Sequence, residues 1–395
     1  MGATLTVAAV LAITALIAAM FSVELGLSVA VIEILAGMIV GNTLHVATPE
    51  WLIFLAGFGS VVLTFLAGAE VDPVSLRQSW KASTLIGTLS FAAPFVAAML
   101  ACRYLAGWDW PAAQIGGIAL STTSLAVVYA VLVESGLNST RIGQLIMSST
   151  FVTDLGTVLA LSVLFVRPTW WLVPFGAVSV GLIVVMPRLE GWFFGRYGSR
   201  VIEPEIKGAF AALLGLMWLA DKAASHAVLP AFLLGLAVSR TFERHRVTQQ
   251  RFRVVAFALL TPFFFLKSGM TVSIPLVWAN LGLLALLLVV KLAAKGVAVH
   301  PLARRYAKPH AAFTTLLMST GLTFGTISAT YGYAAGIVDR AQFSVLVCVV
   351  VLTAVVPTAI AQRFFAPHPA AVTATAGQAE PVETAEPAES AERGA

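Results

Sequence analysis

The chain has 395 residues, of which 59% are hydrophobic and only 11% are charged, whereas about a quarter of the residues in soluble globular proteins are charged. This composition excludes a water-soluble fold, because so few charges cannot cover its surface. The formal net charge of +5 does not indicate nucleic-acid binding, since the basic residues lie in short loops and form no basic arm interleaved with aromatic residues.

Apolar stretches of about twenty residues recur along the whole chain, which is typical of membrane-spanning segments. In hydrocarbon every backbone polar group must be bonded internally, so the spans are either helices or the strands of a closed barrel. The runs are too long for barrel strands and do not alternate between polar and apolar residues, so we predict helices. The short segments 27–40 and 208–220 are expected to be tilted or partly re-entrant. We therefore predict an all-α polytopic membrane protein with thirteen spans, at 3–21, 27–40, 51–70, 82–102, 111–134, 142–165, 169–187, 208–220, 227–239, 254–271, 276–299, 312–335 and 342–362.

The ends of the chain differ from the spans. No Lys or Arg precedes the first apolar run, so we interpret it as a span rather than a cleaved signal. Residues 366–395 are rich in Ala, Pro and Glu and are predicted to be a disordered tail beyond a transmembrane domain at 1–365.

Loop charges predict the orientation. With the N-terminus outside, the loops after odd-numbered spans carry sixteen Lys and Arg, whereas the opposite loops carry only four, Arg103, Arg167, Lys222 and Arg340. Because basic loops favour the cytoplasm, this asymmetry supports an odd number of spans, with the C-terminus inside.

Two spans are interrupted by small polar residues. Span 111–134 contains Ser121, Thr122, Thr123 and Ser124, and span 312–335 contains Ser319, Thr320 and Gly321, followed by Thr323. The two interruptions are seven spans apart, so they cross the membrane in opposite senses. This pattern is typical of transporters with inverted repeats and a binding site at the midplane. We predict repeats at 3–165 and 208–362 joined by a linker helix at 169–187; the alternative is that these small residues merely let helices pack closely.

Asp154 is the sharpest candidate for a functional residue, because it lies in the middle of span 142–165 among apolar neighbours. A charged side chain at the bilayer centre costs about 3 kcal/mol, so it normally faces a cavity or a partner. A carboxylate there can hold either a proton or a cation, and this competition is the minimal chemistry of an antiporter. The hydroxyls of Thr122, Thr123, Thr320 and Thr323 and freed backbone carbonyls are suitable oxygen ligands. The alternative is a structural Asp154 bonded to a neighbouring helix.

Three lysines also lie inside spans. Lys291 is deep in span 276–299 and needs a partner, such as Asp154 or the carbonyls of a broken helix. Lys295 lies one turn further on and is expected to snorkel to the cytoplasmic edge. Lys267 is expected either to snorkel outward or to serve the site. Glu70, Asp72 and Asp221 lie at span ends, where interfacial capping is the simplest interpretation. The histidines form no metal-ligand cluster, and we expect neither a cofactor nor a resident metal.

Several segments in order resemble the monovalent cation:proton antiporters of the Kef and NapA type, within the sodium/hydrogen exchanger family. The resemblance covers roughly residues 3–362 and is specific because the segments occur in the same order. These segments are FLAGAEVD at 65–72, ALSTTSLAVV at 119–128, ESGL at 134–137, GQLI at 143–146, TD at 153–154, LPAFLLG at 229–235, PFFF at 262–265 with GM at 269–270, and FSVLV at 343–347.

The resemblance implies a core domain with crossed broken helices, a dimerisation domain, elevator-like alternating access, and a homodimer in the bacterial inner membrane. It implies that Asp154 binds the ion and the proton, and that Lys291 matches the family's membrane lysine. The predicted ion- and proton-binding residues are therefore Asp154, Thr153, Thr122, Thr123 and Ser121, and the predicted supporting residues of the site are Lys291, Thr320, Thr323 and Gly321. Electrogenic relatives carry two adjacent acids, whereas this chain has Thr153 before Asp154. The missing acid favours electroneutral one-for-one exchange. The Kef-type nucleotide-binding domain is absent from the chain, so we expect no regulation by nucleotide through it.

The sequence leaves other functions open. The same fold could carry a proton-coupled transporter of an organic anion, since helix N-termini favour anions, or a channel-like pore. An intramembrane enzyme is disfavoured because the chain has no HExxH motif, no GxSxG motif and no paired intramembrane aspartates. The sequence leaves both Na⁺ and K⁺ open.

Overall fold

The computed structural model describes residues 2–44, 48–71, 79–137, 140–165, 169–198 and 202–365. Asp72, Arg167 and the predicted tail at 366–395 lie outside the described residues. The described chain is helical, as predicted. Its α-helices are α1 (Gly2–Leu25), α2 (Val29–Thr43), α3 (Glu50–Ala69), α5 (Trp80–Leu100), α6 (Trp110–Ser121), α7 (Leu125–Glu134), α8 (Arg141–Leu164), α9 (Leu172–Tyr197), α10 (Pro204–Lys222), α11 (Val228–Arg244), α12 (Arg246–Val255), α13 (Thr261–Thr271), α14 (Ile274–Ala279), α15 (Leu281–Tyr306), α16 (Ala311–Met318), α17 (Thr323–Ala334) and α18 (Arg340–Ile360).

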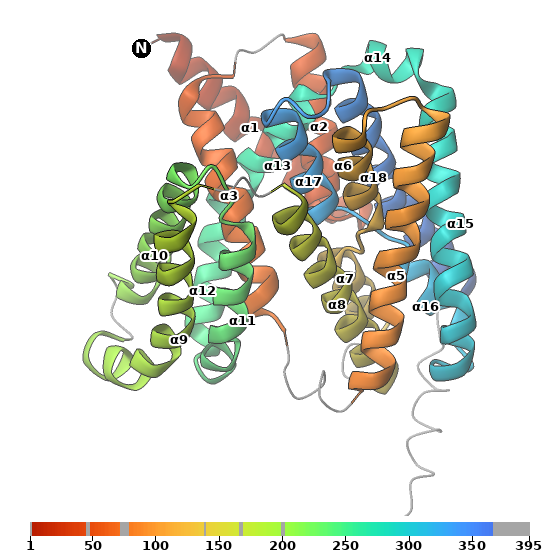
Figure 1. The fold of residues 1–395 in the computed structure, drawn as a ribbon. Coiled ribbons are helices and arrows are strands. Elements are labelled where there is room, and N and C mark those ends of the chain that lie inside the picture. The colour runs from red at the N-terminus through yellow and green to blue at the C-terminus, as the bar shows by residue number, and fades with distance from the viewer. Residues whose placement is uncertain are drawn as a thin grey trace, which may run out of the picture.

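Every predicted span corresponds to a helix or to a pair of helices in sequence. Within the described residues, nine helical segments are long and apolar enough to cross a membrane, and α2 is a shorter apolar helix. The predicted spans 208–220, 227–239 and 312–335 correspond to α10, α11 and the pair α16–α17, which are shorter or less apolar than the nine. They nevertheless run beside the other spans in one bundle (Figure 1).

The helices divide into two packed groups (Figure 1). In the first, which we name the crossing half, α5 packs against α6, α8 and α15, while α17 packs against α6 and α18. In the second, the scaffold half, α2 packs against α1 and α13, α3 packs against α11 and α13, and α9 packs against α10 and α11. Each half therefore combines a group of helices from the first part of the chain with a group from the second part, and in the crossing half this brings the two interrupted spans together.

Paired glycines bring the helices of the scaffold half into close contact. A Cβ at Gly68 would meet the carbonyl of Phe232, and a Cβ at Gly235 would meet the carbonyl of Phe65, so α3 and α11 depend on each other's glycine. Gly37 and Gly269 form the same reciprocal contact between α2 and α13. Small residues at such crossings let backbones approach, which is how helices associate tightly in membranes.

The position of α15 corrects one predicted boundary. The predicted span was 276–299, but the hydrophobic stretch begins with the separate short helix α14, and α15 itself runs from Leu281 to Tyr306. Lys295 consequently lies near the middle of α15 rather than near its end. The buried side chains of α15 recur every fourth residue, at Leu287, Lys291, Lys295, Val299 and Ala303, so one face of the helix carries both lysines into the protein.

Candidate ion and proton site

Both predicted interruptions are real breaks in helices. Helix α6 ends at Ser121 and α7 begins at Leu125, while α16 ends at Met318 and α17 begins at Thr323. In Figure 1, α6 and α17 lie in the upper part of the bundle and α7 and α16 lie in the lower part. Because the chain descends through the first pair and rises through the second, the two broken helices run in opposite directions.

Hydrogen bonds join the two breaks. The Thr123 hydroxyl donates to the Met318 carbonyl at 2.9 Å, and the Ser124 backbone N–H donates to the Thr320 hydroxyl at 3.3 Å. Two glycines make room for the crossing, because a Cβ at Gly325 or at Gly321 would lie 3.1 Å or 2.9 Å from the Thr122 hydroxyl oxygen. The breaks therefore form one unit of unwound backbone surrounded by oxygen atoms, all of it buried.

The hydroxyls predicted to be cation ligands differ in the hydrogen bonds that they make. Ser121 donates to the Ile118 carbonyl at 2.8 Å, and Thr122 donates to the Ala119 carbonyl at 3.1 Å, so both cap the end of their own half-helix. Thr320 likewise donates to the Leu317 carbonyl at 2.8 Å. Thr323 is half-buried and opens α17. The Thr320 hydroxyl oxygen also accepts from the Ser124 backbone N–H, and a hydroxyl oxygen has two lone pairs, of which a second can coordinate a cation.

Asp154 lies in α8 with only 2% of its surface exposed, and its Oδ1 atom is buried without a hydrogen-bond partner. Thr150, one turn before it, contacts the Met318 sulfur at 3.6 Å, so this face of α8 is directed at the second break. A buried carboxylate oxygen without a donor is costly. Such an atom is a natural place for a proton or a bare cation.

Thr153 lies on a different face of α8. Its hydroxyl lies 3.1 Å from the Ser149 carbonyl and 3.3 Å from the Gly87 carbonyl, and it donates toward both. Thr153 therefore connects α8 to α5, in the position where the resemblance places a second acid.

The prediction for Lys295 was wrong. It does not snorkel to an edge: its side chain is fully buried, and its ammonium donates to the hydroxyls of Ser90 and Thr123, each at 2.8 Å. The cause is the later start of α15, which places Lys295 level with the crossing. Lys295 is also the cation that acts electrostatically on Asp154, although no ion pair within 4.0 Å joins these two described residues.

Lys291 is buried as expected, but its hydrogen-bond partner was not foreseen. Its ammonium donates to the Thr353 hydroxyl of α18 at 3.0 Å. The same ammonium also occupies the space where a Cβ on Gly321 would lie, so Lys291 reaches the second break. Of the two partners expected for it, the broken helix is the one that it contacts.

Sequence reasoning missed Ser90 of α5, which is fully buried and holds Lys295. A single serine in an apolar helix carries no distinctive signal, so only packing reveals it. At the span ends, Glu70 forms an ion pair with Arg253 at 3.1 Å. Lys267 is half-buried in α13.

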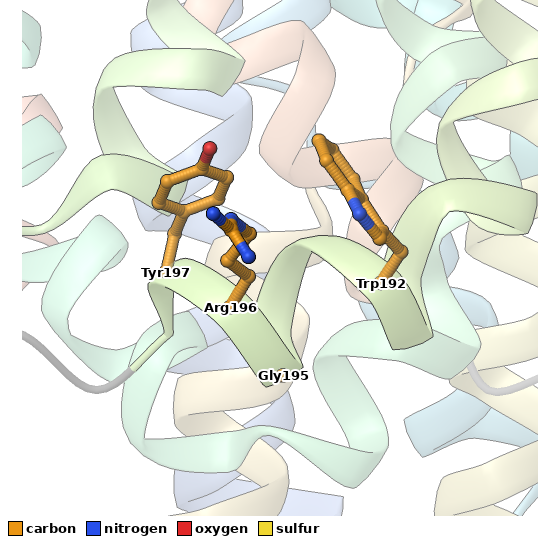
Figure 2. Close-up of a pocket in the computed structure, with 4 residues that line it drawn as sticks. All are labelled: Trp192, Gly195, Arg196 and Tyr197. Carbon is orange, nitrogen blue, oxygen red and sulfur yellow. The ribbon is translucent and has the colours of Figure 1, made fainter.

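A separate hollow of about 690 Å³ opens at the C-terminal end of α9 and is lined by Trp192, Gly195, Arg196 and Tyr197 (Figure 2). The Arg196 guanidinium lies 6.0 Å from the centre of the Tyr197 ring. The hollow is formed by one exposed helix of the scaffold half and contains none of the residues of the crossing.

Comparison with known proteins agrees with this arrangement. The family model described as sodium/hydrogen exchanger, transmembrane, matches residues 10–366. A Methanocaldococcus jannaschii protein named probable Na(+)/H(+) antiporter 3 is 27% identical over 354 residues, covering 84% of this chain and 89% of that protein. A glutathione-regulated potassium-efflux system protein of Haemophilus influenzae is 27% identical over 357 residues, covering 86% of this chain and 57% of the relative.

Among solved structures, the sodium proton antiporter MjNhaP1 from Methanocaldococcus jannaschii at pH 8 is similar, with a TM-score of 0.69 and 11% identity. The likeness covers 91% of this chain and 98% of the other. It confirms the predicted all-helical antiporter fold.

Proposed function

Because the chain belongs to the sodium/hydrogen exchanger family, we propose that it exchanges Na⁺ or K⁺ for H⁺ by alternating protonation and cation binding at Asp154. Family membership makes it a membrane transporter rather than an enzyme, and monovalent cation:proton antiport is the activity of that family. Relatives named for Na⁺ exchange and for potassium efflux are about equally similar to it, so both cations enter the proposal.

The observation that carries the role of Asp154 is its buried, unpartnered Oδ1 beside two crossed helix breaks. The interiors of the described helices of the crossing half contain no other acidic side chain. Oxygen atoms of the broken helices supply the hard ligands that an alkali cation prefers. Protonation would instead leave a neutral carboxylic acid that needs no cation.

A single carboxylate also supports electroneutral exchange. Asp154 accepts either one proton or one monovalent cation, so one positive charge travels each way in a cycle. Thr153 stands where a second acid would sit, and its hydroxyl is used in packing α8 against α5. The Lys295 ammonium is bonded to hydroxyls rather than to an acid within 4.0 Å, so no acid–lysine pair takes part in this scheme.

Alternating access would move the crossing half against the scaffold half. The contact between them includes stacked rings of Phe151 and Phe232, 5.5 Å apart, and the edge of Phe324 against Phe232 at 6.0 Å. Apolar rings can slide past one another without breaking directional bonds. We further propose that the scaffold half carries a homodimer contact, and that the protein lies in a bacterial inner membrane with its N-terminus outside and its C-terminus in the cytoplasm.

The test is cation-driven proton movement in proteoliposomes, with Na⁺, K⁺ and Li⁺, for the wild type, Asp154→Asn and Asp154→Glu. We expect wild-type exchange to be unchanged by clamping the membrane voltage, Asp154→Asn to be inactive, and Asp154→Glu to retain part of the activity. Full exchange by Asp154→Asn would contradict the site. Voltage-dependent exchange would contradict electroneutrality. Current without proton movement would indicate a pore, and proton-coupled uptake of an organic anion would indicate the other alternative.

A further inference from the structure

The Lys295 ammonium is enclosed by hydroxyls at the centre of the crossing half. Two of its three N–H groups donate to Ser90 and Thr123 at 2.8 Å, and all three side chains are essentially inaccessible. An ammonium has donors only, so both hydroxyl oxygens must accept. Ser90 belongs to α5, Thr123 to the first break and Lys295 to α15, so the contact joins three separate elements.

The Thr123 hydroxyl oxygen therefore already binds a cationic group, the Lys295 ammonium. Its proton goes to the Met318 carbonyl, while its oxygen accepts from Lys295. The same oxygen is a predicted ligand for the transported ion. The ammonium of Lys295 thus acts as a tethered cation that uses part of the ligand set of the site.

Ser90 lies level with Asp154 along the packed helices α5 and α8. Gly87, one turn before Ser90, fits against α8, since a Cβ there would lie 2.6 Å from the Ser149 carbonyl. Phe91, next to Ser90, packs on Gly156, two residues beyond Asp154. Ser90 is consequently held at the height of the carboxylate by glycine contacts on either side.

The geometry points to Ser90 as a positioning residue that, together with Thr123, holds the Lys295 ammonium away from Asp154. This inference rests on the proposed function and names a determinant of cation affinity within it. Asp154 and Lys295 interact electrostatically but form no ion pair within 4.0 Å, and Oδ1 of Asp154 stays unpartnered. With Ser90 removed, the freed N–H turns toward the carboxylate, because a carboxylate is a stronger acceptor for an ammonium than a hydroxyl. The tethered ammonium then competes with Na⁺ or K⁺ for Asp154.

The experiment measures the KM for the driving cation and the maximal exchange rate in proteoliposomes, for the wild type and Ser90→Ala. We expect the KM of Ser90→Ala to rise about tenfold, as for loss of a hydrogen bond to a charged group, with the maximal rate within about twofold. Ser90→Thr keeps the hydroxyl and restores a low KM. The matched control is Ser83→Ala, because Ser83 is a fully buried serine on the same helix, two turns away, bonded to Ser79 rather than to a lysine.

A double-mutant comparison separates positioning from simple packing. In a Lys295→Met background the competing ammonium is gone, so Ser90→Ala should no longer change cation affinity. Cation affinity is read there from the rise in thermal stability on adding Na⁺ or K⁺, which does not require transport. An equal loss of affinity in both backgrounds would overturn the proposal, because it would show that Ser90 acts without Lys295.

The remaining outcomes are also decisive. If the wild type exchanges cations for protons but Ser90→Ala behaves like Ser83→Ala, the positioning role is wrong and the antiporter function stands. If the wild type shows no such exchange, the proposed function itself fails. Should Ser90→Ala not fold, Ser90→Cys takes its place, because a thiol is a weak acceptor of similar size; a KM equal to that of the wild type would contradict the proposal.

Discussion

The crossing half and the scaffold half use different chemistry for close packing. In the crossing half, buried polar side chains bond to one another and to backbone carbonyls at the breaks. The Thr123 hydroxyl, for example, donates to the Met318 carbonyl and accepts from the Lys295 ammonium. In the scaffold half, reciprocal glycines and phenylalanine rings fill the contacts, with Phe65 against Phe242 at 5.9 Å and against Phe252 at 5.3 Å. The difference agrees with the proposed function, in which the crossing half holds the ion site and the scaffold half supports it.

The strongest test of this division replaces one threonine in each half. Thr123→Val removes an acceptor from a buried ammonium and a donor from a carbonyl, so we expect proton exchange to fall by at least about tenfold. Thr64→Val is the matched control, because the buried Thr64 hydroxyl bonds only to the Ser60 carbonyl of its own helix. Proteoliposome flux at equal protein content measures both, and similar losses would contradict the division.

Gly321→Ala should reduce exchange by several-fold. The new Cβ would overlap the Lys291 ammonium and lie 2.9 Å from the Thr122 hydroxyl oxygen, so one flexible side chain must move at the second break. Gly296→Ala, in α15 of the same half, adds its Cβ to open space and should leave exchange unchanged. If flux in the two variants were the same, Gly321 would have no special role at the crossing.

Gly235→Ala should lower stability rather than cation affinity. Its Cβ would meet the Phe65 carbonyl and lie 2.9 Å from the Ala69 backbone nitrogen, and neither backbone group can move freely. Overpacking of this kind costs about 1–3 kcal/mol. Thermal unfolding in detergent measures the effect against Gly215→Ala, where space is open, and the KM of the folded fraction should equal that of the wild type. A raised KM with unchanged stability would show that the scaffold contact tunes the site.

The smallest expected effect concerns His226, in the loop between α10 and α11, whose ring lies 4.0 Å from that of Tyr331 in α17. Burial lowers the pKa of His226 to about 4, below its ordinary value near 6.5. Between these two values the unfolded chain binds a proton that the folded chain does not, so stability should fall as the pH drops from about 6.5 to about 4. Between pH 7 and pH 5 the loss should be about 2 kcal/mol, and His226→Phe should reduce it when unfolding temperatures at these two pH values are compared. An unchanged pH dependence in that variant would place its origin elsewhere.

The elements that could be predicted are those with a strong local signal. The small and polar residues at 121–124 and 319–323 predict helix breaks because they interrupt apolar spans, and both breaks are present. The buried position of Asp154 follows from its distance to either end of its span. The role assigned to Asp154 stays a prediction. The predicted boundary before α15 was wrong, because residues 274–290 carry no charge and their sequence does not reveal the short helix α14.

The sequence by itself determined that this protein is a helical membrane protein with two opposed broken helices and an acid, Asp154, in the middle of a span. Composition and the length of apolar runs suffice for this, since hydrocarbon leaves the backbone so few alternatives. Only the tertiary structure decided that Lys295 donates to Ser90 and Thr123 whereas Lys291 donates to Thr353, and that Gly68 and Gly235 depend on each other. These contacts depend on how far each helix is rotated and shifted against its neighbours, and a shift of one turn is enough to exchange one lysine for the other.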